Sequence, residues 1–473
     1  MAFSICGETH RRVRRNCCVS CALLMLLAPF LTSTGSAQTV PPRPLGADLP
    51  VFRPGELGAG EASPCEGSPT GSLSLREALA LALMQSPELA VFSWELRAQD
   101  ARILQAGRPP NPVVSALVED LGAATRVTGA EGLVQPQTTI QLSQMIELGG
   151  KRVARQRLAE RTRDLAAWDF EAARIDVFTR VARTFIDVLA SQQAVAVSER
   201  TLRLVEEVRQ TVGARVTAGV VSPIEQTKAE VALATVRIES DRAKRTLAAD
   251  RTRLAALWGG AAARFESAAG DLTVLPAVPA FGALQDRLAR NPELARWSTE
   301  IAQREAALEV ERSKRVPDVT VSAGYRRFTD LDSNALLIGA SVPLPLFDRN
   351  RGGIQEASAR VSKAQAEQRA AQMRVTTALA EAYRAMAGAQ DEVATLGANV
   401  IPGAQSAFEA VSEGYRLGRF GYLDVLDAQR TLVSANAQYL RALAEFHKAV
   451  AEVERLIGAP LAVPAPATSP GLQ

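Results

Sequence analysis

The sequence predicts a mostly α-helical chain with a small β part, built as an internal two-fold repeat. Three observations predict this fold. A pattern of about 200 residues occurs twice, long stretches carry apolar residues at heptad spacing, and four segments of about 10 residues break the helical period. A repeat of this length is a whole structural unit used twice.

Short matches in equivalent places define the two copies. Ser86-Pro87-Glu88-Leu89 returns as Asn291-Pro292-Glu293-Leu294, Pro110-Asn111 returns as Pro317-Asp318, and the turn from Ala218 to Glu225 returns from Leu417 to Asp424. We therefore expect repeat 1 at residues 73–259, a connector at 260–280 and repeat 2 at 281–459.

The N-terminus has the features of a secretory signal peptide. Four arginines precede an apolar run from Val19 to Leu31, and Gly35-Ser36-Ala37 offers small residues for cleavage before Gln38. This run falls short of the roughly 20 apolar residues that a membrane-spanning helix requires, and no later window reaches that length. We expect residues 1–37 to be removed and the chain to be exported.

Composition excludes several classes of function. Of the five cysteines only Cys65 lies beyond the signal peptide, so the exported chain has no internal disulfide. Cleavage removes four of 54 basic and one of 51 acidic residues, which leaves no net charge and argues against a nucleic-acid partner. His447 is the one remaining histidine, and no Cys/His cluster, phosphate loop or nucleophile elbow is present. We expect no enzyme, no catalytic residue, no cofactor and no metal site.

The helices follow the repeat. A first long helix is expected from Lys151 to near Val212, about 93 Å at 1.5 Å per residue, and its partner from Pro223 to Leu257. The second copy is expected at 353–411, with a kink at Pro402, and at 423–456. Residues 38–72 are rich in Pro and Gly, and the tail 460–473 is rich in Pro and Ala, so we expect neither helix nor strand there.

Four segments read as strands. They are Pro112 to Leu121, Gln137 to Ile146, Pro317 to Phe328 and Ala335 to Leu344. Each has about the length of a tilted strand that crosses a bilayer. Since an outer-membrane barrel needs at least eight strands, membrane-spanning strands would require several copies. Three copies would give twelve strands and an open lumen. The alternative is a set of short strands in a soluble sheet.

The repeat, the paired strands that lead into long helices and the stretch from Gly414 to Gln429 together resemble the TolC-like outer membrane efflux protein family. The resemblance implies a trimer in the outer membrane. A twelve-stranded β-barrel, four strands per chain, would be continued by a coiled-coil-like α-helical barrel in the periplasm. It also implies a periplasmic adapter (membrane fusion) protein and an inner-membrane RND pump as partners. The junctions at 144–152 and 343–352 are similar to the CzcC-type cobalt-zinc-cadmium (heavy-metal) efflux branch.

The resemblance also implies roles for individual residues. Asp424 and Asp427 share one helix face and would line a closed periplasmic mouth, where they would attract cations; alternatively, they complement the helix dipole. Glu225 and Tyr415 would form a latch between the two helical hairpins. Its basic partner is left open, because Phe420 occupies the matching position and Arg419 stands beside it.

Turn and junction residues complete the candidate sites. Gly219, Ser222, Gly418 and Gly421 lie at the two hairpin turns, where the adapter would dock; the alternative is a plain turn role. Lys151, Arg152, Arg349 and Arg351 lie where strand becomes helix. A cation at a helix N-terminus is disfavoured by the helix dipole. We therefore expect these four side chains to be stabilised by lipid phosphates or, alternatively, by local pairing with Glu147 or Asp348.

The sequence thus predicts a passive channel of a tripartite efflux system, with divalent heavy-metal cations as the expected substrate. Two alternatives stay open. One is a drug or type I protein secretion channel of the same family, and the other is a soluble periplasmic helical adapter or scaffold.

Overall fold

The computed structural model describes residues 71–119, 124–127, 130–133, 136–328 and 332–461, all of which belong to one compact unit of residues 43–473. The predicted signal peptide, Cys65, and most of the segment 38–72 and of the tail 460–473 lie outside the described residues.

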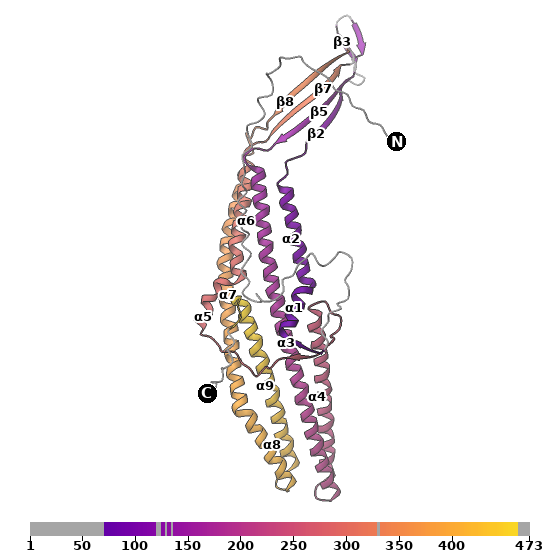
Figure 1. Cartoon of the computed structure of the whole chain (residues 1–473), viewed down its shortest axis with the longest axis vertical. Helices are drawn as coiled ribbons and strands as arrows, with labels where there is room; N and C mark the ends of the chain where they lie inside the picture. The colour runs from indigo at the N-terminus through magenta and orange to yellow at the C-terminus, as the bar shows by residue number, and fades with distance from the viewer. Residues whose placement is uncertain (1–70, 120–123, 128–129, 134–135, 329–331, 462–473) are drawn as a thin grey trace, which may run out of the picture. The chain divides into compact units, whose positions relative to one another are not determined.

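Figure 1 shows how the elements are arranged. The helices are α1 (Leu75–Gln85), α2 (Pro87–Ala106), α3 (Lys151–Thr217), α4 (Pro223–Ala256), α5 (Phe281–Gln285), the 3-10 turn η1 (Asp286–Arg290), α6 (Pro292–Ser313), α7 (Arg351–Thr395), the π turn η2 (Leu396–Val400), α8 (Ile401–Arg416) and α9 (Tyr422–Ile457). The strands are β1 (Gly71–Ser74), β2 (Val113–Glu119), β3 (Ala124–Val127), β4 (Ala130–Leu133), β5 (Gln137–Ile146), β6 (Phe265–Ala269), β7 (Val319–Phe328) and β8 (Ser333–Ser341). The predicted mostly helical fold with a small β part is confirmed.

Helix starts follow local capping chemistry in both repeats. α2, α4 and α6 each begin with proline at the first helical position. A backbone N–H at that position has no partner within the helix, so proline loses no hydrogen bond there. The Asn291 side chain caps α6 by accepting from the Leu294 N–H at 3.1 Å, and its Nδ2 donates to the Leu456 carbonyl at 2.6 Å. This one side chain therefore joins the start of α6 to the end of α9.

The second long helix is divided more finely than the sequence predicts. The stretch expected as one helix kinked at Pro402 consists of α7, the π turn η2 and α8, with Pro402 in the first turn of α8. Proline has no N–H to donate, and its ring crowds the carbonyl four residues earlier. A wider turn directly before the proline relieves both conflicts and changes the helical register from that point onward.

The four predicted strands form one antiparallel sheet in the order β2-β5-β7-β8. Three of them are shorter than expected, and β7 begins at Val319, two residues after Pro317. β2 begins at Val113 because Pro112 has no N–H for the ladder, and β8 covers Ser333–Ser341 because Pro343 and Pro345 follow it. Leu121 lies outside the described residues.

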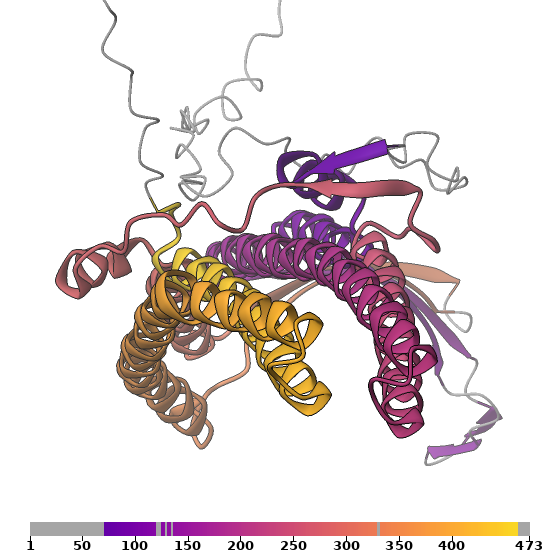
Figure 2. The same ribbon diagram turned by 90° about the horizontal axis from the view of Figure 1, so that it is seen from below.

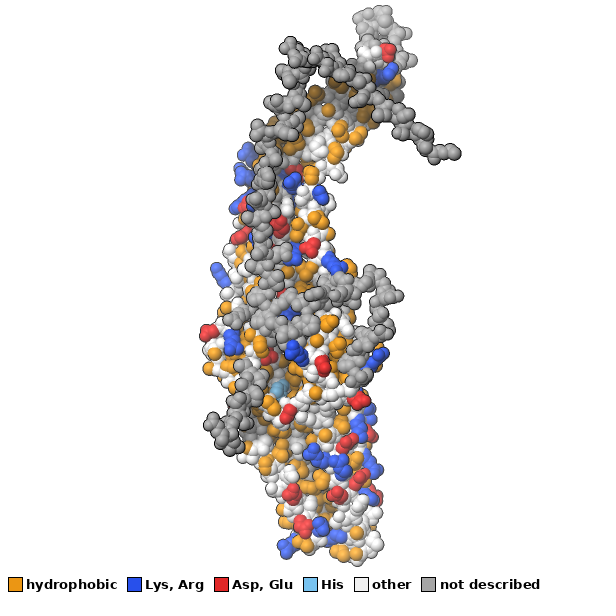
Figure 3. Space-filling model, viewed as in Figure 1, with side chains coloured by type: hydrophobic (Ala, Val, Ile, Leu, Met, Phe, Trp, Pro, Cys, Tyr) orange, Lys and Arg blue, Asp and Glu red, His pale blue; other side chains and the backbone are white. Residues whose placement is uncertain are grey.

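The register gives this sheet one apolar and one polar face. Val114 pairs with Leu142, Leu142 with Ala323, and Ala323 with Ile338, so these residues share a face. Ile338 on that face is 90% exposed. Ser115, Gln141 and Ser322 belong to the opposite face. In Figure 3 the visible described part of the sheet is largely free of charged side chains, whereas the helices carry many.

Two strand pairs were not predicted. β1 pairs in parallel with β6, which places strand residues in the expected Pro/Gly-rich segment (Gly71 and Ser72) and in the expected connector 260–280. β3 and β4 form a short hairpin between β2 and β5. Strands of four or five residues carry too little periodicity to be recognised. The partners β1 and β6 lie almost two hundred residues apart in the chain, so only the folded core brings them together.

The buried core runs along the middle of the helices. One cluster joins Phe185 of α3 to Leu83 of α1, Phe265 of β6 and Leu443 of α9. A second joins Met386 of α7 to Phe446 of α9. α9 thus contributes to both clusters and holds the two repeats together. Within the described ranges, no helix has the length and apolar character that a membrane span requires.

Candidate functional site

The two helical hairpins, α3–α4 and α8–α9, end next to each other, as Figure 2 shows from below. A separate apolar cluster lies in the helices next to these turns and contains residues of all four helices. It consists of Val212, Ala229, Phe408, Tyr415, Tyr422 and Val425. The turns of repeat 1 and repeat 2 are therefore packed against each other within one chain.

Both turns are Schellman motifs. Gly219 and Gly418 have φ of 73° and 75°, the left-handed conformation that favours glycine. In each turn the residue after the glycine donates its N–H back into the preceding helix, Val220 to Arg215 and Arg419 to Gly414. Equivalent bonds in the two copies show that the repeated turn sequence forms the same structure twice.

The helices that leave these turns are capped differently. The Ser222 side chain accepts from the Ile224 N–H at 3.4 Å. In the other hairpin the Gly421 N–H donates to Asp424 Oδ2 at 2.8 Å. Asp424 therefore caps α9, while the side chain of Asp427, one turn further on, is exposed. The two aspartates lie on one face but have different local environments.

A direct hydrogen bond joins the hairpins. The Tyr415 hydroxyl of α8 donates to Glu225 Oε2 of α4 at 3.0 Å, and Tyr415 is only 3% exposed. Burial and the hydrogen bond to Glu225 raise the pKa of Tyr415 to about 12. Burial and the nearby Glu225 charge also raise the pKa of Tyr422 to about 12, and its ring centroid lies 6.0 Å from that of Tyr415.

Arg215 in the last turn of α3 is the basic group beside this pair. Its guanidinium donates to the Tyr415 carbonyl oxygen, and its Cζ lies 4.5 Å from the centroid of the Tyr415 ring. The sequence did not single out Arg215. The signal was a cation in a helix's last turn, which the helix dipole favours, but that signal does not indicate which neighbour the cation contacts.

Phe420, at the position that matches the basic partner, and Arg419 beside it both take part in the turn after α8. The Phe420 ring packs so closely on Gly414 that a Cβ there would lie 2.2 Å from Phe420 Cδ2. Arg419 contributes its backbone N–H to the turn. Tyr415 is thus held from repeat 1 by two side chains, the Glu225 carboxylate and the Arg215 guanidinium. We call Arg215, Glu225 and Tyr415 the hairpin latch.

A groove lies between α4 and α9, directly above the turns. It has a volume of about 610 Å³ and is lined by both helices, with Val231 and Ala232 on one side and Leu423 and Leu426 on the other. Lys228 and Arg430 also line it. The latch holds together the two hairpins that form its walls.

The candidate junction cations lie at the other end of α3 and α7. Lys151 Nζ lies 2.7 Å from Asp318 Oδ1, an ion pair between the repeats, and Glu147 pairs with Arg155 instead. Asp348 accepts from the Asn350 backbone N–H at 2.8 Å rather than pairing with a cation.

In the described part of the chain, the remaining junction cations pair with no carboxylate. Arg349 Nε donates to the Pro345 carbonyl at 3.3 Å. Among the described residues, neither Arg152 nor Arg351 forms an ion pair, and both are exposed. Local pairing with Glu147 or Asp348 therefore accounts for none of the four candidates.

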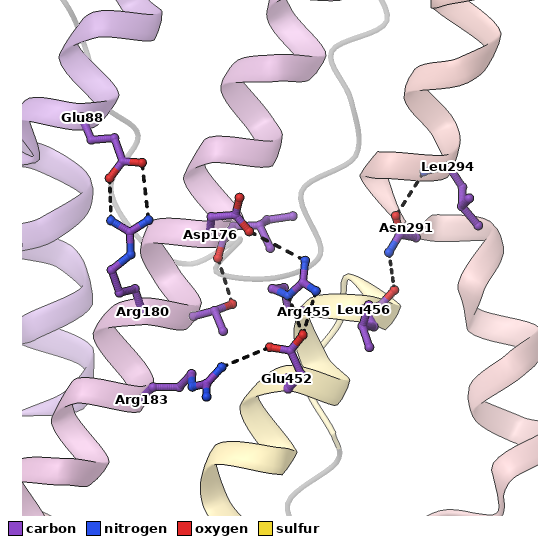
Figure 4. A network of polar contacts seen from close by, with 11 residues as sticks. Glu88, Asp176, Arg180, Arg183, Asn291, Leu294, Glu452, Arg455 and Leu456 are labelled. Atoms are coloured by element: carbon purple, nitrogen blue, oxygen red, sulfur yellow. Dashed lines mark hydrogen bonds and ion pairs between the residues drawn. The ribbon is translucent and has the colours of Figure 1, made fainter. Parts of the chain in front are cut away.

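A polar network joins the repeats near the middle of the helices (Figure 4). Arg455 of α9 lies 3.8 Å from Asp176 of α3 and pairs with Glu452, which in turn lies 3.6 Å from Arg183. Burial raises the pKa of Asp176 despite the nearby charges of Arg455 and Arg180. Asn291 belongs to the same region, so the network fixes α3, α6 and α9 relative to one another.

No metal centre emerges from the described residues. Histidine, cysteine and acidic side chains there form no group of three or more that could hold an ion. His447 Nε2 lies 2.9 Å from the Leu272 carbonyl, and burial lowers the pKa of its imidazole. His447 is therefore a packed residue.

Comparisons with known proteins agree with this architecture. The family described as outer membrane efflux protein matches residues 78–260 and 283–459. The chain is 38% identical to the cobalt-zinc-cadmium resistance protein CzcC of Cupriavidus metallidurans, over 82% of this chain and 90% of that protein. It is 29% identical to the nickel-cobalt-cadmium resistance protein NccC of Alcaligenes xylosoxydans, over 74% and 75%.

Solved structures share the fold. The CusC channel superposes with a TM-score of 0.68 at 15% identity and covers 82% of this chain and 94% of that chain. The outer membrane protein VceC of Vibrio cholerae gives 0.66 at 19% identity, with 82% and 97% covered. With two matched regions that follow the internal repeat, the chain belongs to the outer membrane efflux protein family and is a transport component of the outer membrane rather than an enzyme, as the sequence predicts.

Proposed function

We propose that three copies of this chain form a passive channel, the outer membrane component of a tripartite efflux system for divalent heavy-metal cations. The observation that carries the proposal is the four-stranded sheet, with its apolar face, its polar face and its two free edges. In the described residues β2 and β8 each pair with a strand on one side only. Free edges of this length are a liability unless another chain covers them.

Pairing β8 of one copy with β2 of the next covers both edges. Three copies supply twelve strands, enough for a barrel with an open lumen. The apolar face with Leu336 and Ile338, 84% and 90% exposed, would then contact lipid. The polar face would line the lumen, where Arg326 pairs with Glu119 at 3.1 Å and donates to Thr139 at 2.9 Å.

Repeat 1 at 73–259 and repeat 2 at 281–459 would each contribute one helical hairpin, so a trimer has six. They would form the periplasmic extension of the channel. Without a metal-binding cluster in the described residues, selection of the cation falls to an inner-membrane RND pump and a periplasmic adapter. Relatives named for resistance to cobalt, zinc, cadmium and nickel support this substrate class.

The hairpin tips would serve as the gate and the docking site. The latch would hold the two hairpins together, and three copies of Asp424 and Asp427 would give the mouth a negative potential that attracts cations. The turns at Gly219, Ser222, Gly418 and Gly421 would contact the adapter. Their exposed apolar side chains, among them Val220 and Leu417, support such a contact.

Export of an organic substrate is the second candidate. It is favoured by the match to the pyoverdine export outer membrane protein OpmQ of Pseudomonas putida at 24% identity. The lower identity makes it the weaker candidate. Membership of the outer membrane efflux family weighs against a soluble adapter or scaffold.

A deletion strain tests the proposal. We expect loss of the chain to lower tolerance to zinc, cobalt and cadmium and to raise their cellular content, and we expect the intact gene to restore both. A strain that carries the Gly388→Ala variant, a substitution with open space around it within α7, controls for expression level. Unchanged tolerance to zinc, cobalt, cadmium and copper, together with new sensitivity to organic compounds, would refute metal export and favour export of an organic substrate.

A further inference from the structure

A large hollow lies at the corner where repeat 1 changes from helix to strand and back. Its volume is about 1310 Å³, and the end of α2, the approach to β2, the end of β5 and the start of α3 form its walls. Five cations line it, Arg102, Arg108, Lys151, Arg152 and Arg155, against a single acid, Glu147. This strong excess of positive charge is unusual in a chain with almost no net charge.

Two of the five cations are neutralised. Lys151 pairs with Asp318 at 2.7 Å, and Arg155 forms two hydrogen bonds with Glu147. The other three, Arg102, Arg108 and Arg152, are exposed, and within the described ranges no acid pairs with them. Three guanidinium groups at one hollow repel one another unless an anion lies between them.

The start of α3 adds to the need for an anion. Gly150 precedes the helix in a left-handed conformation, and no side chain caps the first turn. The first N–H groups of the helix are therefore left for an outside acceptor. Arg152 stands in that first turn, where the helix dipole opposes a cation. A bound anion would satisfy both the free amides and the cation.

The adjoining strands place exposed apolar side chains next to the hollow. Ile146 lines the hollow, and alternation along β5 places it on the same sheet face as Leu142, which pairs with Val114. These three side chains are 44%, 50% and 69% exposed. A hollow that binds anions thus continues into the apolar face of the sheet.

The equivalent corner of repeat 2 is built differently. Where repeat 1 has Asn111, repeat 2 has Asp318, and Glu311 of α6 accepts from Asn350 Nδ2 at 2.8 Å. Asp318 pairs with Lys151 of the first corner, and Glu311 is the acid that lies beside the start of α7. At the corner of repeat 1, by contrast, the three cations that pair with no acid of the described ranges line one hollow.

We infer that this hollow binds the phosphate of an anionic phospholipid, with the headgroup between Arg102, Arg108 and Arg152 and the acyl chains on the apolar face of the sheet. Guanidinium groups suit this role because their paired N–H donors match phosphate oxygens. The inference rests on the proposed function, since it needs the sheet to lie in a membrane. One lipid per chain would hold the corner at the depth of the inner headgroup layer.

Native mass spectrometry of the purified full-length protein tests the inference. Phosphatidylglycerol, phosphatidylcholine and inorganic phosphate are the probes. We expect up to three bound phosphatidylglycerol molecules per trimer, at least tenfold weaker binding of phosphatidylcholine, and no displacement by inorganic phosphate. Displacement by phosphate would indicate a free-anion site and overturn the lipid assignment.

Charge-matched variants give the control. The triple variant Arg102→Gln, Arg108→Gln, Arg152→Gln should lose phosphatidylglycerol binding at least tenfold. Arg315 follows the end of α6 and is exposed. The triple variant Arg315→Gln, Arg349→Gln, Arg351→Gln removes the same charge at the second corner and should keep phosphatidylglycerol binding. Equal loss in both would show general surface attraction and overturn the site.

Separate measurements distinguish this inference from the proposed function. If a triple variant does not assemble, the three single substitutions of the first set should each weaken binding, and full retention in all three would also overturn the site. A wild-type trimer that conducts but binds no phosphatidylglycerol refutes only the lipid inference. A wild-type chain that neither assembles into trimers nor conducts refutes the proposed function.

Discussion

Loss of the hydrogen bond between Tyr415 and Glu225 should loosen the two helical hairpins. The phenol donates to the carboxylate at 3.0 Å from an almost fully buried position. In Tyr415→Phe the ring and its packing against Tyr422 remain, while the donor is lost. In Glu225→Gln the acceptor loses its charge but keeps its shape. The two substitutions therefore isolate a single bond.

A hydrogen bond to a charged group contributes about 1.5–3 kcal/mol. Glu225 is partly exposed, which favours the lower end, so we expect a coupling of about 1.5 kcal/mol, or roughly tenfold in an equilibrium constant. The bond should also limit alkaline stability. Because the pKa of Tyr415 is raised from 10.0 to about 12, its contribution is complete below pH 10 and is lost as the pH rises through 12.

Planar-bilayer recording measures the consequence for the channel. We expect each single variant to raise the open probability and the combination Glu225→Ala with Tyr415→Phe to leave the mouth more open. The cycle of Glu225→Ala, Tyr415→Phe and their combination should be non-additive. Tyr439→Phe is the control, because the Tyr439 hydroxyl donates to none of the described residues. Unchanged single-channel conductance in the double variant, or strict additivity, would refute the latch.

Three further predictions concern the tips and the C-terminal end of α9. Gly418→Val forces a branched residue to φ of 75°, so it should destabilise the turn by about 1–2 kcal/mol and reduce crosslinking to the adapter. Gly388→Ala within α7 is the control and should do neither. Intact trimers with normal crosslinking in Gly418→Val would count against docking there. Asp427→Asn should lower the cation selectivity of the channel without changing its stability. Asp424→Ala should lower the selectivity and also the thermal midpoint of unfolding, because a lost cap costs about 1 kcal/mol. Equal stability of the two variants would contradict the capping role of Asp424. Burial raises the pKa of Glu454 from 4.5 to about 6, so the stability that the protonated carboxyl gives below pH 4.5 is lost as the pH rises through 6. Glu454→Gln should therefore stabilise the protein by up to about 2 kcal/mol at pH 7 but not at pH 4. A pH-independent effect in thermal unfolding would refute this.

Local sequence determined most elements of this protein. Proline at the first helical position, glycine in the left-handed turns and the alternation in the strands act over a few residues, so their consequences can be predicted without a fold. The copy of each signal in the second repeat strengthened the prediction. Errors arose where a local signal was short, as in β1, or where two local effects compete, as at Pro402 and the π turn before it.

Only the tertiary structure decided which side chains meet. The hairpin latch shows this most clearly: the family resemblance pointed to Glu225 and Tyr415, but Arg215 lies 200 residues before Tyr415 and contacts it only because the two hairpins pack side by side. Lys151 pairs with Asp318 of the other repeat for the same reason. Sequence spacing determines which residues share a helix face or a strand face. Contacts between repeats depend on how those faces pack, and no local pattern records that choice.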